Sequence, residues 1–107
     1  MAKKSIIVII KKFAAALIKK GITVDKIILY GSHAKGKERP DSDIDVAVVS
    51  RDFGKDKIEE GMLLFTIAGE IDARLEPVPI SLESYKKDTW VPLIYEIRTK
   101  GIELKAA

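Results

Sequence analysis

Helical spacing of apolar residues recurs in three segments of the chain. Residues 5–20, SIIVIIKKFAAALIKK, place apolar side chains on one broad face and lysines on the other, and Gly21 follows as a stop. Residues 58–71 are predicted to form a second amphipathic helix, with Asp56 as a candidate N-cap. Its apolar face is predicted to include Ile58, Met62, Phe65 and Ile71. Residues 90–99 complete the set of predicted helices.

Short apolar runs bounded by turn residues predict the strands. The first strand is predicted over residues 24–30 and the second over 44–49, and both runs read as buried. A third strand is predicted over 73–80. Pro77 and Pro79 indicate that it is an edge strand, or one whose far end is unpaired, because proline cannot donate to a ladder. A last short strand is predicted over 102–105.

The order of these elements predicts the class of fold. Helix, strand, strand, helix, strand, helix and a short final strand indicate one small mixed β-sheet covered by helices on one face, in the α/β (α+β) class. The chain has 107 residues, of which 47% are hydrophobic, and this is enough for one core and not for two. We therefore expect a single domain over residues 1–107.

Composition excludes several classes of protein. The chain has no cysteine and one histidine, so neither a disulfide framework nor a cysteine zinc site can form. The 19 basic and 16 acidic residues give a net charge of +3, too small a surplus to indicate a nucleic-acid partner. The longest apolar stretch, residues 6–18, is interrupted by lysines and is shorter than the ~20 residues of a membrane span. We expect a cytoplasmic protein without a membrane segment.

Two acidic residues stand at the start of the second strand. Asp43 and Asp45 are two positions apart, so their carboxylates point to the same face, about 7 Å from each other. Ile44 and Val46 then face the core, which leaves the acids on the open face. Two such carboxylates repel each other unless they share a hard cation, and Mg²⁺ binds one or two carboxylates together with substrate phosphates.

A glycine and a serine end the preceding strand. Gly31 lets the backbone approach a ligand closely, and Ser32 can offer its hydroxyl and backbone N–H to phosphate oxygens. An acidic strand beside such a turn has the chemistry that nucleotidyl transfer needs, since metal ions neutralise the polyphosphate and activate the attacking hydroxyl.

These residues together carry a family resemblance. The pattern Gly31-Ser32-x10-Asp43-x-Asp45, with Ser42 just before the first acid, resembles the active-site motif of the DNA polymerase beta-like nucleotidyltransferase superfamily. The short length is similar to that of its smallest branch, the minimal nucleotidyltransferases. The resemblance covers residues 30–49 in motif detail and, through the order of elements, nearly the whole chain.

The resemblance implies a fold and a set of site residues. It implies the polymerase beta-like nucleotidyltransferase fold, nucleotide binding by Gly31, Ser32 and Ser42, and Mg²⁺ binding by Asp43 and Asp45. A third metal-binding and catalytic carboxylate is implied on a later strand. Glu76 is the best match for it, and Asp72 is the alternative.

The resemblance also implies an activity. It implies Mg²⁺-dependent transfer of a nucleoside monophosphate, AMP from ATP or the equivalent from another nucleoside triphosphate, to an acceptor hydroxyl. The acceptor is expected on a helical HEPN-type partner protein, in the manner of the antitoxin of a toxin–antitoxin pair.

Several alternatives remain open at the level of the sequence. A non-catalytic module that neutralises a partner could have the same fold, and a homo-oligomer is not excluded. His33 could act as a general base or could contact phosphate or solvent. Lys35, Lys37 and Arg39 could steer an anionic nucleotide or belong to a hydrated loop.

Overall fold

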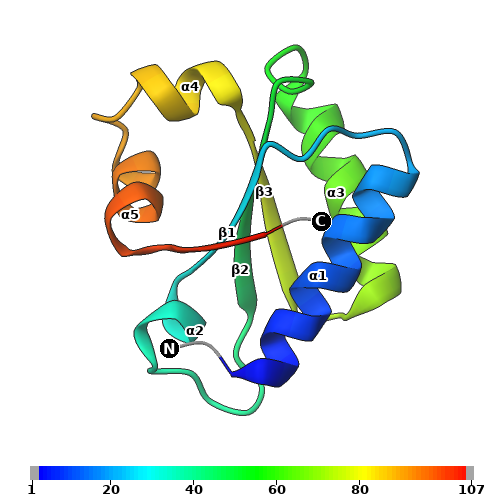
Figure 1. Ribbon diagram of the computed structural model, residues 1–107, viewed down its shortest axis with the longest axis vertical. Coiled ribbons are helices and arrows are strands. Elements are labelled where there is room, and N and C mark those ends of the chain that lie inside the picture. The colour runs from blue at the N-terminus through cyan, green and yellow to red at the C-terminus, as the bar shows by residue number, and fades with distance from the viewer. Residues whose placement is uncertain (1–2, 106–107) are drawn as a thin grey trace.

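Four strands form one mixed sheet in the order β3-β2-β1-β4 in the computed structural model, which describes residues 3–105 (Figure 1). The strands are β1 (Lys26–Tyr30), β2 (Ile44–Ser50), β3 (Leu75–Ser81) and β4 (Ile102–Leu104). Strand β1 pairs antiparallel with β2 and with β4, whereas β2 and β3 are parallel. The mixed sheet predicted from the sequence is therefore confirmed. The limits of the predicted domain, residues 1 and 107, lie outside the described residues.

Helices cover both faces of this sheet. The helices are α1 (Lys4–Lys19), α2 (Ser32–Lys35), α3 (Lys57–Ile71), α4 (Leu82–Lys87) and α5 (Pro92–Lys100). The long helices α1 and α3 lie on one side of the sheet, and α4 and α5 lie on the other (Figure 1). The sequence predicted helices on one face of the sheet, and the structure corrects this to both faces. None of the helices in residues 3–105 has the length and apolar character that a membrane crossing requires.

The second covered face follows from the composition of the central strands. Along β2, Val46 and Val48 belong to the core beneath α1 and α3. The alternate residues Ala47 and Val49 belong to a second core, which α5 completes with Ile94 and Ile97. A strand that is apolar at successive positions must be buried on both sides, because alternate side chains leave the sheet in opposite directions.

Strand β3 lies at the edge of the sheet, as its prolines predicted. The backbone N–H of Ile44 donates to the carbonyl of Arg74 at 2.8 Å, and Ile44 is the register partner of Leu75. In a parallel ladder, alternate residues of β3 direct their backbone groups toward β2. Because Arg74 is one of these residues, the nitrogens of Pro77 and Pro79 point away from β2. The prolines therefore cost the sheet no hydrogen bonds, and they remove donors from the free edge.

Helices α2 and α4 were not predicted. Helix α2 is a single turn that begins at Ser32, directly after Gly31. Helix α4 directly follows β3, where the side chain of Ser81 accepts a hydrogen bond from the N–H of Ser84 at 3.1 Å. The predicted cap of α3 is confirmed, because Asp56 Oδ1 accepts from the N–H of Glu59 at 3.0 Å.

The apolar face predicted for α3 is wrong at three of its four residues, since only Ile71 packs against the core. Ile58, Met62 and Phe65 are 78%, 66% and 60% exposed. The buried residues of α3 are Leu64, Ile67 and Ala68. This helix carries apolar residues around most of its circumference, so its periodicity does not identify the inner face. Contact with α1 and β3 decides which side is buried.

Neighbouring residues of α3 should therefore respond differently to substitution. Leu64→Ala is expected to lower the free energy of unfolding by about 2–5 kcal/mol, because Leu64 is fully buried. Phe65→Ser is expected to change it by no more than about 0.5 kcal/mol, because most of that ring is already in water. Urea denaturation followed by circular dichroism measures both values. A loss for Phe65→Ser as large as for Leu64→Ala would show that the outer face of α3 is buried in solution.

Candidate active site

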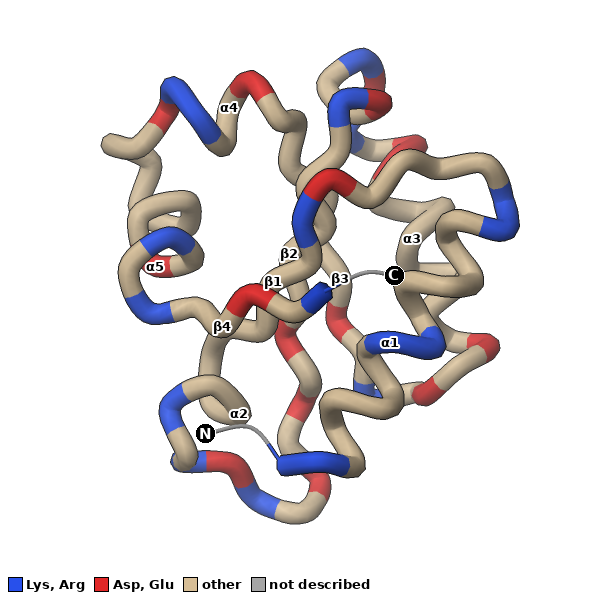
Figure 2. Tube along the Cα trace, viewed as in Figure 1, with Lys and Arg blue, Asp and Glu red and all other residues tan. Residues whose placement is uncertain are grey.

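One row of side chains crosses three strands of the sheet. Asp45 on β2 is the register partner of Tyr30 on β1 and of Glu76 on β3. Residues in register project from the same face, and here it is the face that α5 covers, since Tyr30 packs against that core. Acidic positions accordingly lie next to each other on β2 and β3 in Figure 2. The structure thus brings Asp45 and Glu76 side by side, with Asp43 two residues before Asp45.

The charges in this row act on one another. Partial burial raises the pKa of the Asp45 carboxyl above its usual range, and the nearby carboxylates of Asp43 and Glu76 raise it further. His33 acts in the opposite direction. Burial also raises the pKa of Tyr30 to about 12, with Asp45 as the next cause, so the phenol stays protonated and can donate a hydrogen bond. The row therefore attracts a cation and repels further negative charge.

The two candidates for the third carboxylate lie in different surroundings. Glu76 is exposed and stands in the row beside Asp45. Asp72 ends α3, and its carboxylate accepts hydrogen bonds from the backbone N–H of Arg74 at 2.8 Å and from the Arg74 guanidinium at 3.1 and 3.2 Å. These bonds to Arg74 lower the pKa of Asp72. The carboxylate of Asp72 is thus bound by Arg74 at the end of α3, and Glu76 is the carboxylate beside Asp45.

Gly31 approaches the side chain of Asp45 closely. Its backbone has φ +74° and ψ −151°, a conformation that is almost restricted to glycine. A Cβ placed on Gly31 would overlap Oδ2 of Asp45 and would lie 3.1 Å from Cγ. Gly31 is also the N-cap of α2, which begins at Ser32. The Gly31–Ser32 turn and the acidic row therefore form one continuous site.

Ser42 and His33 hold the loop that leads to Asp43. The hydroxyl of Ser42 accepts from the N–H of Arg39 at 2.7 Å, and the carbonyl of Ser42 lies 3.3 Å from Nε2 of His33. A carbonyl only accepts, so Nε2 carries the proton in this bond. The interpretation of His33 as a solvent contact is wrong, because the residue is 3% exposed. His33 instead joins α2 to the residue that precedes Asp43.

The sequence did not predict two residues that lie near the row. Tyr30 directly precedes Gly31, and its alternation with the buried Leu29 could have placed it on the face of the acids. Glu96 of α5 lies 3.8 Å from the Lys35 ammonium in an ion pair that links α5 to α2. Nothing in the local sequence of α5 indicates this position, since the contact depends on how α5 packs across the sheet.

The oxygen donors of the row fit a hard divalent cation. Within residues 3–105, no three His, Cys, Asp or Glu side chains already converge on a point that could hold a metal ion. Mg²⁺ does not need such a cage, because it usually binds one or two carboxylates and completes its octahedron with water and substrate phosphates. Asp43, which is exposed just before β2, and Asp45, which is half-buried, supply carboxylates of this kind. The donor set therefore suits Mg²⁺ that arrives with a nucleotide.

Known proteins similar to this chain share its fold. The family model described as "Polymerase beta, Nucleotidyltransferase" matches residues 11–106. No curated protein matches the chain. A candidate nucleotidyltransferase from Sulfolobus solfataricus, known from a crystal structure, superposes with a TM-score of 0.66 at 12% identity, over 92% of this chain and 78% of that chain. A chain in a crystal structure of a toxin–antitoxin with AMP-PNP superposes with a TM-score of 0.63 at 25% identity, over 91% of this chain and 73% of that chain.

Proposed function

The chain belongs to the polymerase beta nucleotidyltransferase family, and on this basis we propose that it transfers a nucleoside monophosphate, AMP from ATP, to an acceptor hydroxyl in a Mg²⁺-dependent reaction. The observation that carries the proposal is the row across β2 and β3. It sets Asp45 beside Glu76 and within contact of the Gly31 backbone. Carboxylates beside a glycine turn whose backbone N–H groups would bind phosphate suit a polyphosphate substrate.

Each residue of the site has a part in this reaction. The backbone at Gly31 and Ser32 would bind the phosphates, while Ser42 holds the loop before Asp43. Asp43 and Asp45 would hold Mg²⁺, which neutralises phosphate charge when bound. The acceptor oxygen forms a bond to the α-phosphorus, and the bond from that phosphorus to the oxygen bridging to the β-phosphate breaks. Pyrophosphate leaves, and the exposed carboxylate of Glu76 takes the proton of the acceptor hydroxyl.

A protein is the acceptor that the comparisons favour. The similar chain at 25% identity comes from a toxin–antitoxin structure that contains AMP-PNP, so nucleotide and partner occur together in that protein. We assign the present chain the role of an antitoxin that modifies a hydroxyl of its partner, a helical HEPN-type protein. A partner-neutralising module without catalysis is the competing function.

Label transfer distinguishes the two functions. With ATP labelled at the α-phosphate, the chain co-expressed with the product of its neighbouring gene is expected to place label covalently on that product. Chelation of Mg²⁺ should abolish the labelling, and ATP labelled at the γ-phosphate should leave no label, because the γ-phosphate departs in pyrophosphate. Neutralisation of the partner without any α-label would contradict catalysis and would support the binding module.

A further inference from the structure

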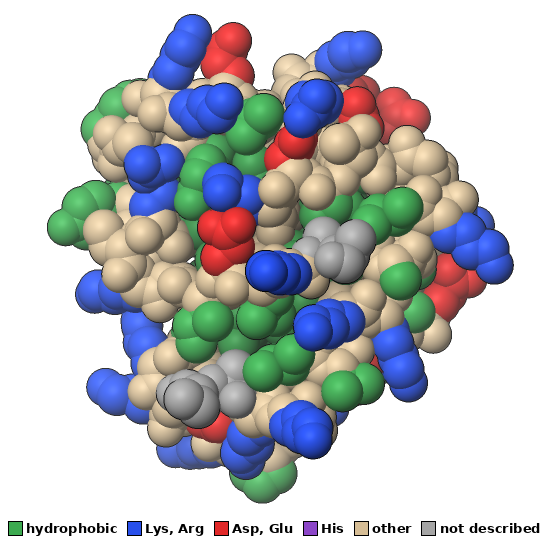
Figure 3. Space-filling view, in the orientation of Figure 1, with side chains coloured by type: hydrophobic (Ala, Val, Ile, Leu, Met, Phe, Trp, Pro, Cys, Tyr) green, Lys and Arg blue, Asp and Glu red, His purple; other side chains and the backbone are tan. Residues whose placement is uncertain are grey.

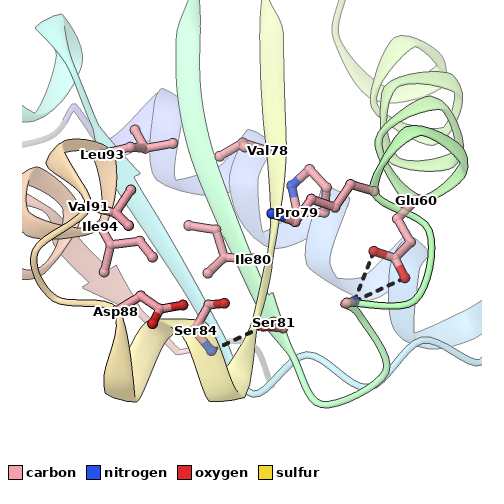
Figure 4. A pocket seen from close by; sticks show the side chains of 12 residues that line it. Glu60, Val78, Pro79, Ile80, Ser81, Ser84, Asp88, Val91, Leu93 and Ile94 are labelled. Carbon is pink, nitrogen blue, oxygen red and sulfur yellow. Dashed lines mark hydrogen bonds between the residues drawn. The ribbon is translucent and has the colours of Figure 1, made fainter.

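A cavity of about 360 Å³ lies between β3 and α5 and extends to the beginning of α3, where Lys57 and Glu60 line it. We call it the base slot. Its apolar walls are formed by Val78 and Ile80 of β3 and by Val91, Leu93 and Ile94 at the beginning of α5. The two sets of side chains face each other across the cavity in Figure 4. The space between them is lined mainly by aliphatic groups and suits a flat, apolar ring.

The base slot continues directly from the acidic row. Val78 follows Glu76 by two residues on β3, so both side chains leave the same face of the sheet about 7 Å apart. On the opposite wall, Leu93 precedes Glu96 by about one turn of α5, and Glu96 pairs with Lys35 beside the Gly31–Ser32 turn. Both elements that form the walls therefore run from the slot to the candidate active site.

Polar groups close the far end of the slot. Asp88 and Ser84 line this end, where Figure 4 shows them beyond Ile80 and Ile94. The Asp88 carboxylate is partly buried and makes no hydrogen bond or ion pair within residues 3–105. The neighbouring hydroxyl of Ser81 already accepts from the N–H of Ser84. A carboxylate without a partner is free to accept a hydrogen bond from a ligand, and a hydrogen bond to a charged acceptor is stronger than a neutral one.

We propose that the base slot binds the nucleobase of the substrate and that Asp88 accepts a hydrogen bond from the exocyclic amine of adenine. The proposal rests on the proposed function, because it takes the phosphates to lie at Gly31–Ser32 and the α-phosphate to lie over the Asp45–Glu76 row. The nucleoside then extends along β3, away from the phosphates. Aliphatic side chains contact both faces of the ring, and the Ser84 hydroxyl donates to a ring nitrogen.

One edge of the base tests this assignment. Inosine triphosphate (ITP) carries a carbonyl oxygen where adenine has its amine and an N–H where adenine has the acceptor N1, and a carboxylate repels that carbonyl oxygen. ATP is therefore expected to bind about tenfold or more tightly than ITP, the range of a hydrogen bond to a charged group. The Asn amide of Asp88→Asn can donate to that carbonyl, so this variant should reduce the ratio to about one or reverse it.

Competition binding measures these affinities without catalysis. ATP and ITP are each added, in the presence of Mg²⁺, to the intact protein holding a fluorescent non-hydrolysable ATP analogue. Glu83→Gln is the matched control, since it removes the same charge from α4 at an exposed position that does not line the slot. It should leave the ATP-to-ITP ratio unchanged. Leu93→Trp, which fills the slot from an accessible position, should weaken the binding of both nucleotides.

The outcomes separate this proposal from the proposed function. Equal affinities for ATP and ITP, or an unchanged ratio in Asp88→Asn, would overturn the base slot and leave the transferase intact. If Asp88→Asn or Leu93→Trp lowered label transfer without changing nucleotide affinity, the base slot would also be overturned. The cavity would then be assigned to the acceptor. Failure of every nucleotide to bind would contradict the proposed function together with the slot.

Discussion

Asp45→Asn is expected to lower the rate of nucleotidyl transfer by about a thousandfold. The substitution removes one of the two carboxylates that would hold Mg²⁺, and a metal ion contributes several kcal/mol of charge stabilisation, each 1.36 kcal/mol being tenfold in rate. The shape of the side chain is retained, so the packing against Gly31 is kept. Label transfer from α-labelled ATP to the co-expressed partner measures the effect.

The same variant is expected to be more stable than the natural chain at neutral pH. Burial, followed by the charges of Asp43 and Glu76, raises the pKa of Asp45 above its ordinary value of 3.8. The folded state then holds this proton more tightly than the unfolded state, and the free energy of unfolding falls as pH rises from 3.8 through the folded pKa. The amide side chain of the Asp45→Asn variant does not titrate, so its free energy of unfolding does not fall over this pH range. Thermal unfolding at pH 7 should therefore show a higher midpoint.

Loss of activity with a gain in stability distinguishes a removed metal ligand from a damaged fold. Asp41→Asn is the matched control, because Asp41 is an exposed acid of the loop that precedes β2 and lies outside the row. It should keep both its activity and its midpoint. Label transfer by Asp45→Asn at the natural rate would contradict the assignment of Asp45, and a lowered midpoint would contradict the electrostatic account of the row.

Gly31→Ala is expected to damage both the fold and the activity. At φ +74° and ψ −151° an alanine is strained, which costs of the order of 1–3 kcal/mol in the free energy of unfolding. The added methyl also overlaps the Asp45 carboxylate and must displace it. A displacement of about 1 Å at a catalytic group can lower the rate by about a hundredfold.

Gly21→Ala separates the strain of the backbone from the contact with Asp45. Gly21 also has a positive φ, of +90°, but a Cβ there would meet no atom within 4 Å. Urea denaturation should show that both variants are destabilised, and label transfer should fall only in Gly31→Ala, measured well below its unfolding midpoint. A Gly31→Ala protein with full activity would show that the close approach to Asp45 is not needed for the reaction.

The parts of the site that could be predicted are those carried by local spacing. Alternation along β2 placed Asp45 on the face opposite the buried Ile44 and Val46, and the glycine that follows β1 marked the turn before α2. The family resemblance, and not local spacing, indicated that Glu76 joins Asp45, because 31 positions separate them and their contact depends on the parallel register of β2 and β3. Glu96 was missed because its contact is equally long-range, whereas Tyr30 had a local signal in its alternation with Leu29.

The amino-acid sequence by itself determined the strands, the long helices, the edge position of β3 and the acidic motif, because each depends on residues a few positions apart. Only the tertiary structure decided which side of α3 is buried, that helices cover both faces of the sheet, and that His33 is enclosed beneath the loop before Asp43. These features depend on contacts between segments distant in the chain. Periodicity in the sequence predicts that a helix or strand has an apolar face, whereas tertiary packing determines which segment covers that face.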